Sequence, residues 1–157
     1  MEKQRTLLIG VGNPYRQDDG AGVEVVHRLR RLLSEGIDYV ECTGDLATLM
    51  EIWRGYELVI VADAMRSGCS PGGVVRIDAS RQPLPADMRF FSTHAIGLNE
   101  TLALAHALNR LPPKLVIYGI EGKYFGEGEG LSTEVAKAVE DVVRYILKEL
   151  TEGEGDA

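Results

Sequence analysis

Short apolar runs alternate with segments of helical periodicity along most of this chain. Apolar runs that are too short for a helix predict strands at 7–9, 39–42, 58–62, 74–77 and 115–118. Apolar residues spaced three or four apart predict helices at about 20–34, 45–54, 95–108 and 133–150. The run at 58–62 is continuous and rich in β-branched residues, which is typical of a strand covered on both faces.

This alternation predicts one α/β domain over residues 1–150. We expect a three-layer sandwich, in which helices cover both faces of a mostly parallel, five-stranded sheet. Residues 151–157 are mostly acidic or small, which predicts a disordered tail. Functional sites in such folds lie beyond the carboxyl ends of the strands. The residues that follow the first and third predicted strands include 13–19 and Asp63.

The connection after the first strand is rich in glycine. Gly10, Gly12 and Asn13 predict a turn that ends the strand. Gly20 and Gly22 lie in the first turn of the following helix, where each costs roughly 1 kcal/mol relative to alanine. The pair therefore predicts that something approaches the helix backbone closely at this point.

The start of this connection resembles a dinucleotide-binding fingerprint. The third glycine does not fall where the GxGxxG pattern requires it. In addition, Asp18 and Asp19 place two negative charges where a pyrophosphate would have to lie. Nucleotide binding is therefore disfavoured.

The acids at the predicted sheet edge suggest a different chemistry. An acidic side chain at the start of a helix is favourable, because it can cap the helix. Adjacent residues on a helix point about 100° apart, so we expect Asp18 to cap the helix while Asp19 faces the site. Asp63, at the end of a buried strand, is expected to be desolvated, which disfavours its ionised form. If Asp19 and Asp63 converge, their repulsion is relieved only by a cation between them, which is the physical argument for a metal.

The chain has three histidines, and His94 is the candidate ligand among them. It precedes the third predicted helix, for which Ser92 or Thr93 is the candidate cap, and the positive helix end favours the neutral imidazole that binds metals. His27 is expected to face solvent and His106 to pack within its helix. Two carboxylates and one imidazole suit zinc, nickel, cobalt, manganese or iron, with coordination positions left open. From the residues alone, a functional and a purely structural His94 remain equally open.

Composition narrows the function classes. The 157 residues are 45% hydrophobic, which suits one compact domain, and the net charge of −7 argues against a nucleic-acid partner. No apolar run reaches the ~18–20 residues of a membrane span, and the N-terminus does not resemble a signal peptide. Cys42 and Cys69 lack ligand-like spacing, so we expect buried, reduced thiols in a cytoplasmic protein. Neither a Cys–His nucleophile nor a GxSxG serine is favoured.

Five segments together resemble the hydrogenase maturation proteases, the endopeptidases that finish the large subunit of nickel–iron hydrogenases. They occur in the family's order and span nearly the whole domain. The segments are Gly10–Asn13 with Asp18–Gly22, Val61–Ala64, His94–Leu98, Gly119–Glu121 and Gly130–Val135.

The resemblance implies the same α/β sandwich and assigns the catalytic and metal-contacting roles to Asp19, Asp63 and His94. The family often has glutamate at the first of these positions, and Asp19 keeps the charge with one methylene fewer. Many relatives carry proline after the segment that ends at Glu121, whereas this chain has Gly122, which leaves the identity of the hydrogenase open. Supporting roles in the backbone or loops fall on Gly12, Asn13, Asp18, Gly20, Gly97 and Glu121.

The resemblance also implies a reaction. Family members recognise nickel already inserted in the large-subunit precursor and then remove its C-terminal extension. Three protein ligands leave positions open, so we expect the nickel to come with the substrate and the resting protein to be able to exist without metal. The ion could polarise the scissile carbonyl or activate a water. A non-catalytic nickel-handling or hydrogenase assembly factor on the same scaffold is the alternative.

Overall fold

The computed structural model describes residues 5–33, 35–43, 46–93 and 96–155. Its strands and helices follow one another largely as the hydrophobic pattern predicts. In chain order they are β1 (Thr6–Val11), the 3₁₀ turn η1 (Gln17–Gly20), α1 (Ala21–Leu32), β2 (Ile37–Cys42), the 3₁₀ turn η2 (Leu46–Thr48), α2 (Leu49–Ile52), β3 (Leu58–Met65), β4 (Val74–Asp78), α3 (Leu98–Ala107), β5 (Lys114–Glu121) and α4 (Thr133–Gly155).

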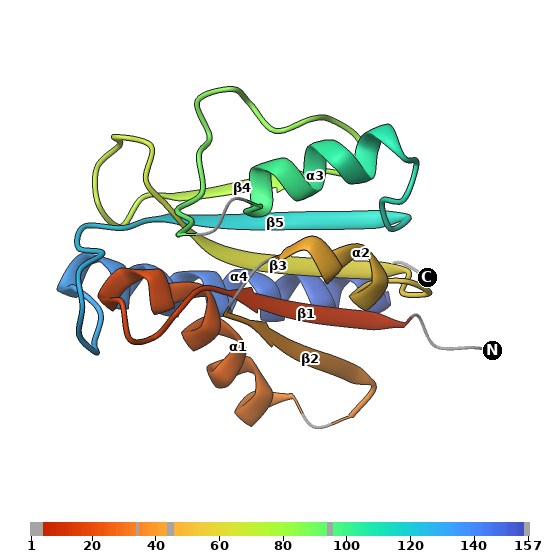
Figure 1. Ribbon diagram of the computed structural model, residues 1–157. Helices are drawn as coiled ribbons and strands as arrows, with labels where there is room; N and C mark the ends of the chain where they lie inside the picture. The colour runs from red at the N-terminus through yellow and green to blue at the C-terminus, as the bar shows by residue number, and fades with distance from the viewer. Residues whose placement is uncertain (1–4, 34, 44–45, 94–95, 156–157) are drawn as a thin grey trace.

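The five strands form one sheet in the order β2-β1-β3-β5-β4 (Figure 1). All neighbouring pairs are parallel except β4 and β5, so the predicted mostly parallel sheet is confirmed. The chain passes from β1 to β2 on one side and returns to β3 on the other. The strand order therefore reverses between β1 and β3, and ligands of such folds bind at the carboxyl ends of strands at such a point.

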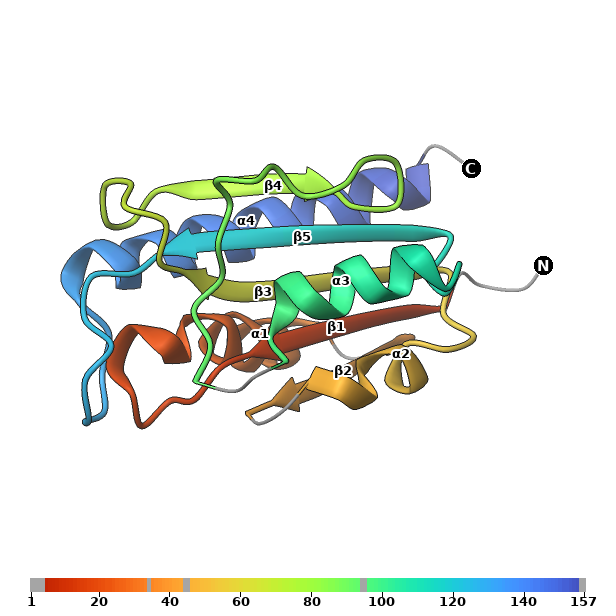
Figure 2. The ribbon, with the colours of Figure 1, turned by 45° about the horizontal axis from the view of Figure 1, so that its top comes forward.

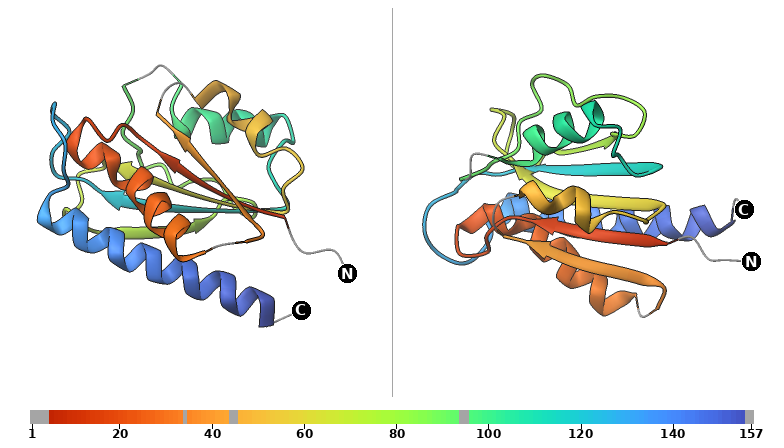
Figure 3. Two further views of the ribbon diagram at one scale, coloured as in Figure 1. Left: turned by 90° about the horizontal axis from the view of Figure 1, so that it is seen from below. Right: turned by 45° about the vertical axis from the view of Figure 1, so that its right-hand side comes forward.

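Helices cover both faces of the sheet, which confirms the predicted three layers. Figures 1 and 3 show α1 and α4 on one face, and Figure 2 shows α3 with α2 on the other. Each face buries its own apolar cluster. One cluster joins α1 and α4 to residues such as Leu8 and Ile60, and the other joins α2 and α3 to residues such as Ile9 and Val61. Alternate residues of the same strands thus fill opposite cores.

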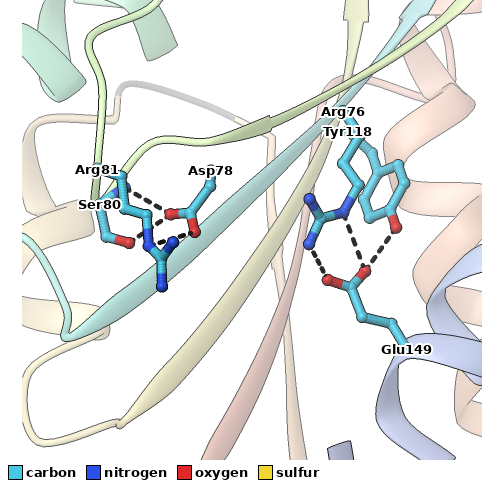
Figure 4. A network of polar contacts seen from close by, with 6 residues as sticks. All are labelled: Arg76, Asp78, Ser80, Arg81, Tyr118 and Glu149. Carbon is cyan, nitrogen blue, oxygen red and sulfur yellow. Dashed lines mark hydrogen bonds and ion pairs between the residues drawn. The ribbon is translucent and has the colours of Figure 1, made fainter. Parts of the chain in front are cut away.

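Polar contacts fasten α4 to the antiparallel edge of the sheet (Figure 4). The Tyr118 hydroxyl donates to Glu149 Oε2 at 2.6 Å, and the Arg76 guanidinium of β4 forms an ion pair with the same carboxylate. Burial, followed by the hydrogen bond to Glu149, raises the pKa of Tyr118. Nearby, at the end of β4, Asp78 contacts both Ser80 and Arg81.

Helix α4 continues through residues 151–155, which the composition assigns to a disordered tail. Thr151 Oγ1 donates to Leu147 O at 2.9 Å, and Lys148 Nζ lies 3.9 Å from Glu152 Oε1. Such contacts one turn apart favour propagation of a helix that is already formed. Among the described residues, no helix is both long and apolar enough to cross a membrane.

Two other boundaries differ from the sequence-based prediction, and both lie near the candidate site. Strand β3 extends to Met65, so Asp63 lies inside it, because pairing with β5 continues to Met65–Glu121. The segment at 89–91 also pairs with the end of β3, where Phe91 N donates to Ala64 O at 3.0 Å. Helix α3 begins at Leu98 with Gly97 as its N-cap, so the predicted caps Ser92 and Thr93 are wrong.

Candidate active site

Asp19 is held at the carboxyl end of β1 by the backbone of the preceding turn. Gly12 has φ +132°, and a Cβ at this position would lie 1.8 Å from Asp19 O. Only glycine therefore lets η1 fold back against the strand end. Asn13 N donates to Asp19 Oδ2 at 3.0 Å, and Asn13 Oδ1 accepts from Tyr15 N at 2.9 Å. Gly12 and Asn13 thus shape the turn that carries Asp19.

The glycines at the start of α1 allow this helix to touch the sheet backbone. A Cβ on Gly20 would lie 2.8 Å from Pro14 Cα, and one on Gly22 would lie 2.1 Å from Ala62 O. The predicted close approach is confirmed, and the approaching atoms belong to this chain itself. It brings the acids of η1 beside the carboxyl end of β3.

Asp63 is a buried acid with one uncommitted oxygen. Its side chain is 1% exposed, and Oδ1 accepts from Ala64 N at 2.8 Å. Oδ2 is buried and has no hydrogen-bond partner within the described part of the chain. Burial, followed by the charge of Asp19, raises the pKa of Asp63 well above its usual range, and the Ala64 N–H opposes this shift. The predicted convergence and desolvation of the two acids are therefore confirmed.

This pair of carboxylates fits a cation. A buried polar atom without a partner is costly, and a cation that binds it relieves both the desolvation and the repulsion from Asp19. Oxygen donors at a sheet edge would suit a divalent metal. The residues with described positions contain no group of three or more His, Cys, Asp or Glu side chains that could hold an ion. The two acids alone therefore form an incomplete site.

The predicted third ligand, His94, lies outside the described residues. Its described neighbours attach the segment to the site on one side and to α3 on the other. Phe91 N bonds to Ala64 O, directly next to Asp63, and Asn99 holds the segment by accepting from Phe90 N at 3.0 Å. Gly97 N donates to Glu100 Oε2 at 3.1 Å at the start of α3.

Asp18 does not cap α1, contrary to expectation. It is fully buried, and its carboxylate accepts hydrogen bonds from Lys123 N, Tyr124 N, Ser132 N and Ser132 Oγ at 2.7–3.0 Å. These donors come from the loop between β5 and α4, which Figure 1 shows beside the β1–α1 connection. The burial and bonding of Asp18 indicate a structural role, since both carboxylate oxygens are occupied.

Further backbone contacts join these two loops. Gln17, which has φ +52°, donates from its N–H to Gly128 O, and Gly128 N donates to Tyr15 O, both at 2.9 Å. Gly126 N donates to Gln17 Oε1 at 3.2 Å. The glycine-rich segment is thus docked onto η1 and forms one wall beside the site.

Glu121 closes the same region from the end of β5. It is 2% exposed, and its carboxylate accepts from Ser67 N at 3.0 Å and from the Ser67 hydroxyl. Its backbone also pairs with Gly72 and Gly73 of the β3–β4 loop at 2.8 Å. Glu121 therefore holds the loop that follows β3.

Several other sequence-based expectations concern the remaining histidines and the cysteines. His106 is exposed on α3, whereas His27 faces solvent as predicted. Cys69 is exposed and Cys42 is half-buried, so the predicted burial of both thiols is wrong, although both are free.

Sequence reasoning also missed Arg16 and Arg66. They line a cavity of about 600 Å³ between the start of η1, the segment that follows β3 and the loop that follows β5. The signal was present, because both arginines lie within three residues of a candidate acid in the sequence.

Comparison with known proteins gives a consistent family. The family model described as hydrogenase maturation protease matches residues 23–149. A candidate hydrogenase maturation protease of Methanocaldococcus jannaschii is 31% identical over 96% of this chain and 99% of its own length. The hydrogenase 2 maturation protease of Escherichia coli is 26% identical over 94% and 92%.

Solved structures share the fold. The hydrogenase maturating endopeptidase HybD from E. coli superposes with a TM-score of 0.78 at 25% identity, over 96% of this chain and 94% of that one. The nickel–iron hydrogenase maturation protease HybD from Thermococcus kodakarensis superposes with a TM-score of 0.70 at 28% identity, over 92% and 98%.

Proposed function

Because this chain belongs to the hydrogenase maturation protease family, a family of hydrolases, we propose that it removes the C-terminal extension of a nickel–iron hydrogenase large-subunit precursor after nickel insertion. The observation that carries this proposal is the buried Asp63, whose Oδ2 has no partner among the described residues, beside the carboxylate of Asp19. A positively charged group bound between the two acids would compensate both carboxylates in their ionised form.

In the proposal, the compensating charge is the nickel that the precursor carries. Asp19 and Asp63 bind it through their carboxylates, and His94 supplies a nitrogen ligand. The segment at 89–91 supports this role for His94, because it is hydrogen-bonded beside Asp63 just before residue 94. Three protein ligands leave coordination positions for the cysteines and the scissile segment of the substrate.

The raised pKa of Asp63 makes the site responsive to metal. Without a cation, Asp63 holds its proton more firmly than an exposed aspartate does. Binding of a cation requires the carboxylate form and therefore releases that proton. A precursor without nickel would bring no cation to compete with that proton, so cleavage would depend on metal insertion.

The reaction is hydrolysis of one peptide bond. A water adds to the scissile carbonyl, the C–N bond breaks, and the products are a shortened large subunit with a new carboxylate and a released peptide with a new amine. The ion supplies polarisation of that carbonyl or of the water. The protein orients the bond through η1, which carries Asp19, and the end of β3, which carries Asp63.

The test uses the cognate precursor purified with and without nickel. Each form is mixed with wild-type protein, and the mass of the large subunit is followed. We expect cleavage of the nickel form alone, and loss of cleavage in Asp19→Asn and Asp63→Asn. Equal cleavage of both forms would contradict the dependence of cleavage on nickel in the substrate, but it would leave the assignment as a protease intact. Cleavage of neither form would favour the non-catalytic nickel-handling or assembly factor.

A further inference from the structure

A cationic trough lies beside η1 and the end of β3, the elements that carry the two acids, in a chain whose net charge is −7. The 600 Å³ cavity is lined by Arg16, Arg66 and Lys123, and by one carboxylate, Glu121. Aromatic rings of Tyr124, Phe125 and Phe91 complete its walls. A local excess of positive charge on an acidic protein indicates an anionic ligand.

The two arginines hold the charge that is not neutralised. Lys123 Nζ lies 3.0 Å from Glu134 Oε2, and the Glu121 carboxylate accepts hydrogen bonds from Ser67 N and Oγ. Neither Arg16 nor Arg66 makes an ion pair within the described ranges. The Nε of Arg16 is also buried without a hydrogen-bond partner there. A buried guanidinium donor without an acceptor requires one from a ligand or from water.

Both arginines stand on fixed backbone. Asp19 N donates to Arg16 O at 3.2 Å, and Arg66 N donates to Arg89 O at 2.9 Å. The Arg66 guanidinium lies 5.8 Å from the centre of the Phe125 ring, which stacks on Phe91 at 4.2 Å. The charges are therefore presented by rigid walls on which a peptide can lie.

The trough lies close to the proposed site. Arg16 is in the same turn as Asp19, and Arg66 directly follows the strand that carries Asp63. A second cavity of about 760 Å³, lined by the segment at 82–92 and by α3, shares Arg66 and Phe91 with it. A substrate segment long enough to reach both cavities would pass Arg66, which favours an acidic side chain within a peptide over a terminal carboxylate.

We infer that Arg16 and Arg66 bind the carboxylate of an Asp or Glu side chain in the substrate segment, a few residues from the scissile bond. This inference rests on the proposed function for the identity of the substrate. The arginines act as specificity residues, since they hold the chain in register while Asp19 and Asp63 contact the metal. Guanidinium groups suit this role because they bind carboxylates through paired hydrogen bonds.

The first test measures binding without metal or cleavage. The probe is a fluorescent peptide of about eight glycines and alanines with both ends blocked and two central glutamates, and its matched control carries two glutamines. We expect wild type to bind the glutamate peptide at least about fivefold more tightly, with the preference shrinking as salt rises from about 50 to about 300 mM. Arg16→Gln and Arg66→Gln should each abolish the preference. Arg54→Gln, on an exposed arginine of the opposite edge, should retain it.

The other arms separate the alternatives. A third peptide without glutamate but with a free C-terminus should bind no better than the glutamine peptide, and tight binding would show a pocket for terminal carboxylates instead. Equal binding of the glutamate and glutamine peptides by wild type would overturn the inference. Arg66→Lys, which keeps the charge, should retain part of the preference and thereby exclude misfolding as the cause of a loss.

Cleavage of the precursor distinguishes this inference from the proposed function. Arg66→Gln should raise KM at least about fivefold and leave kcat within about twofold. The substitution removes a contact that binds the substrate and the transition state equally, while the metal contacts remain. If wild type cleaves the precursor but the variant has an unchanged KM, the trough is not used. If wild type cleaves no precursor but still prefers the glutamate peptide, the proposed function fails and the anion-binding trough stands.

Discussion

Burial and then the negative charge of Asp19 raise the pKa of Asp63, although the two acids are separated in the sequence by α1, β2, η2 and α2. They meet because the carboxyl ends of parallel strands share one sheet edge and because Gly12 and Gly22 let η1 and α1 lie against it. Two acids placed together in a buried position lower stability unless something compensates them. This arrangement therefore makes the two acids candidates for a binding site.

Asp63→Asn should make the fold more stable while removing cleavage. The folded state raises the pKa of Asp63, so below the unfolded-state pKa both states are protonated and the residue costs nothing. As pH rises above that value, Asp63 ionises first in the unfolded state. The unfolding free energy of wild type then falls by about 1.4 kcal/mol per pH unit relative to that of Asp63→Asn, until the pH reaches the folded-state pKa.

Thermal unfolding with a chelator present, at pH values from about 3 to about 8, checks this prediction. The melting temperatures of the two proteins should coincide at the acid end and diverge in favour of Asp63→Asn as pH rises. A variant that is less stable than wild type at pH 8 would show that the acid is already compensated within the chain.

Substitution of Asp18 should lower stability, whereas substitution of Asp19 should abolish cleavage. Asp18→Asn places an amide against the donors at 123, 124 and 132, and should cost about 2–4 kcal/mol of unfolding free energy. Ser132→Ala, which removes one of these bonds, should cost about 1 kcal/mol. Asp19→Asn should change stability by less than about 1 kcal/mol and abolish cleavage.

Hydrogen exchange of residues 122–132 reports the loop directly. Faster exchange there in Asp18→Asn, with cleavage retained at low temperature where the variant stays folded, would confirm the structural role. If Asp18→Asn abolishes cleavage without loss of stability while Asp19→Asn remains active, the assignment of the two acids is reversed.

Gly12→Ala should be far more damaging than a substitution at another glycine of positive φ. The new Cβ would lie 1.8 Å from Asp19 O, so the turn that holds Asp19 must move, at a cost of at least about 3 kcal/mol. Gly36→Ala is the matched control, because Gly36 has φ +80° and nothing within 4 Å of the added Cβ, so it should cost only about 1 kcal/mol. Denaturant unfolding of both variants measures the difference, and equal losses would mean that the backbone dihedral alone matters.

Local pattern and topology together were enough to predict the sheet, the three layers and the meeting of Asp19 with Asp63. Each depends on short-range periodicity or on the general rule for parallel strands. The role of Asp18 could not be predicted in this way, because its donors lie more than a hundred residues later in the chain. The full length of β3 depended likewise on the segment at 89–91, whose pairing with Ala64 has no local signature.

The glycines at the start of α1 show the same limit of prediction from local sequence. The pattern indicated that some group approaches the start of α1, and only the fold reveals that the group is the carbonyl of Ala62. Arg16 and Arg66 were missed because arginine is common on surfaces. Their significance arises because neither forms an ion pair within the described part of the chain, although both line the same cavity.

The isolated protein should bind nickel weakly and release a proton as it does so. Asp63 is protonated more readily than an exposed aspartate, and coordination requires its carboxylate, so binding and deprotonation are coupled. Calorimetric titration in two buffers of different ionisation enthalpy measures both quantities, because the difference in observed heat gives the number of protons released.

We expect His94→Ala and Asp63→Asn each to weaken binding at least about tenfold, which corresponds to about 1.4 kcal/mol. Asp63→Asn should also lose the proton release, since the titrating group is gone, whereas His94→Ala should keep it. His106→Ala, on an exposed histidine of α3, is the control and should bind as wild type does. Equal affinity of His94→Ala and wild type would remove the histidine from the site. Equal affinity of all four proteins would show that the nickel binds elsewhere, and the two acids would then have to be explained without a metal.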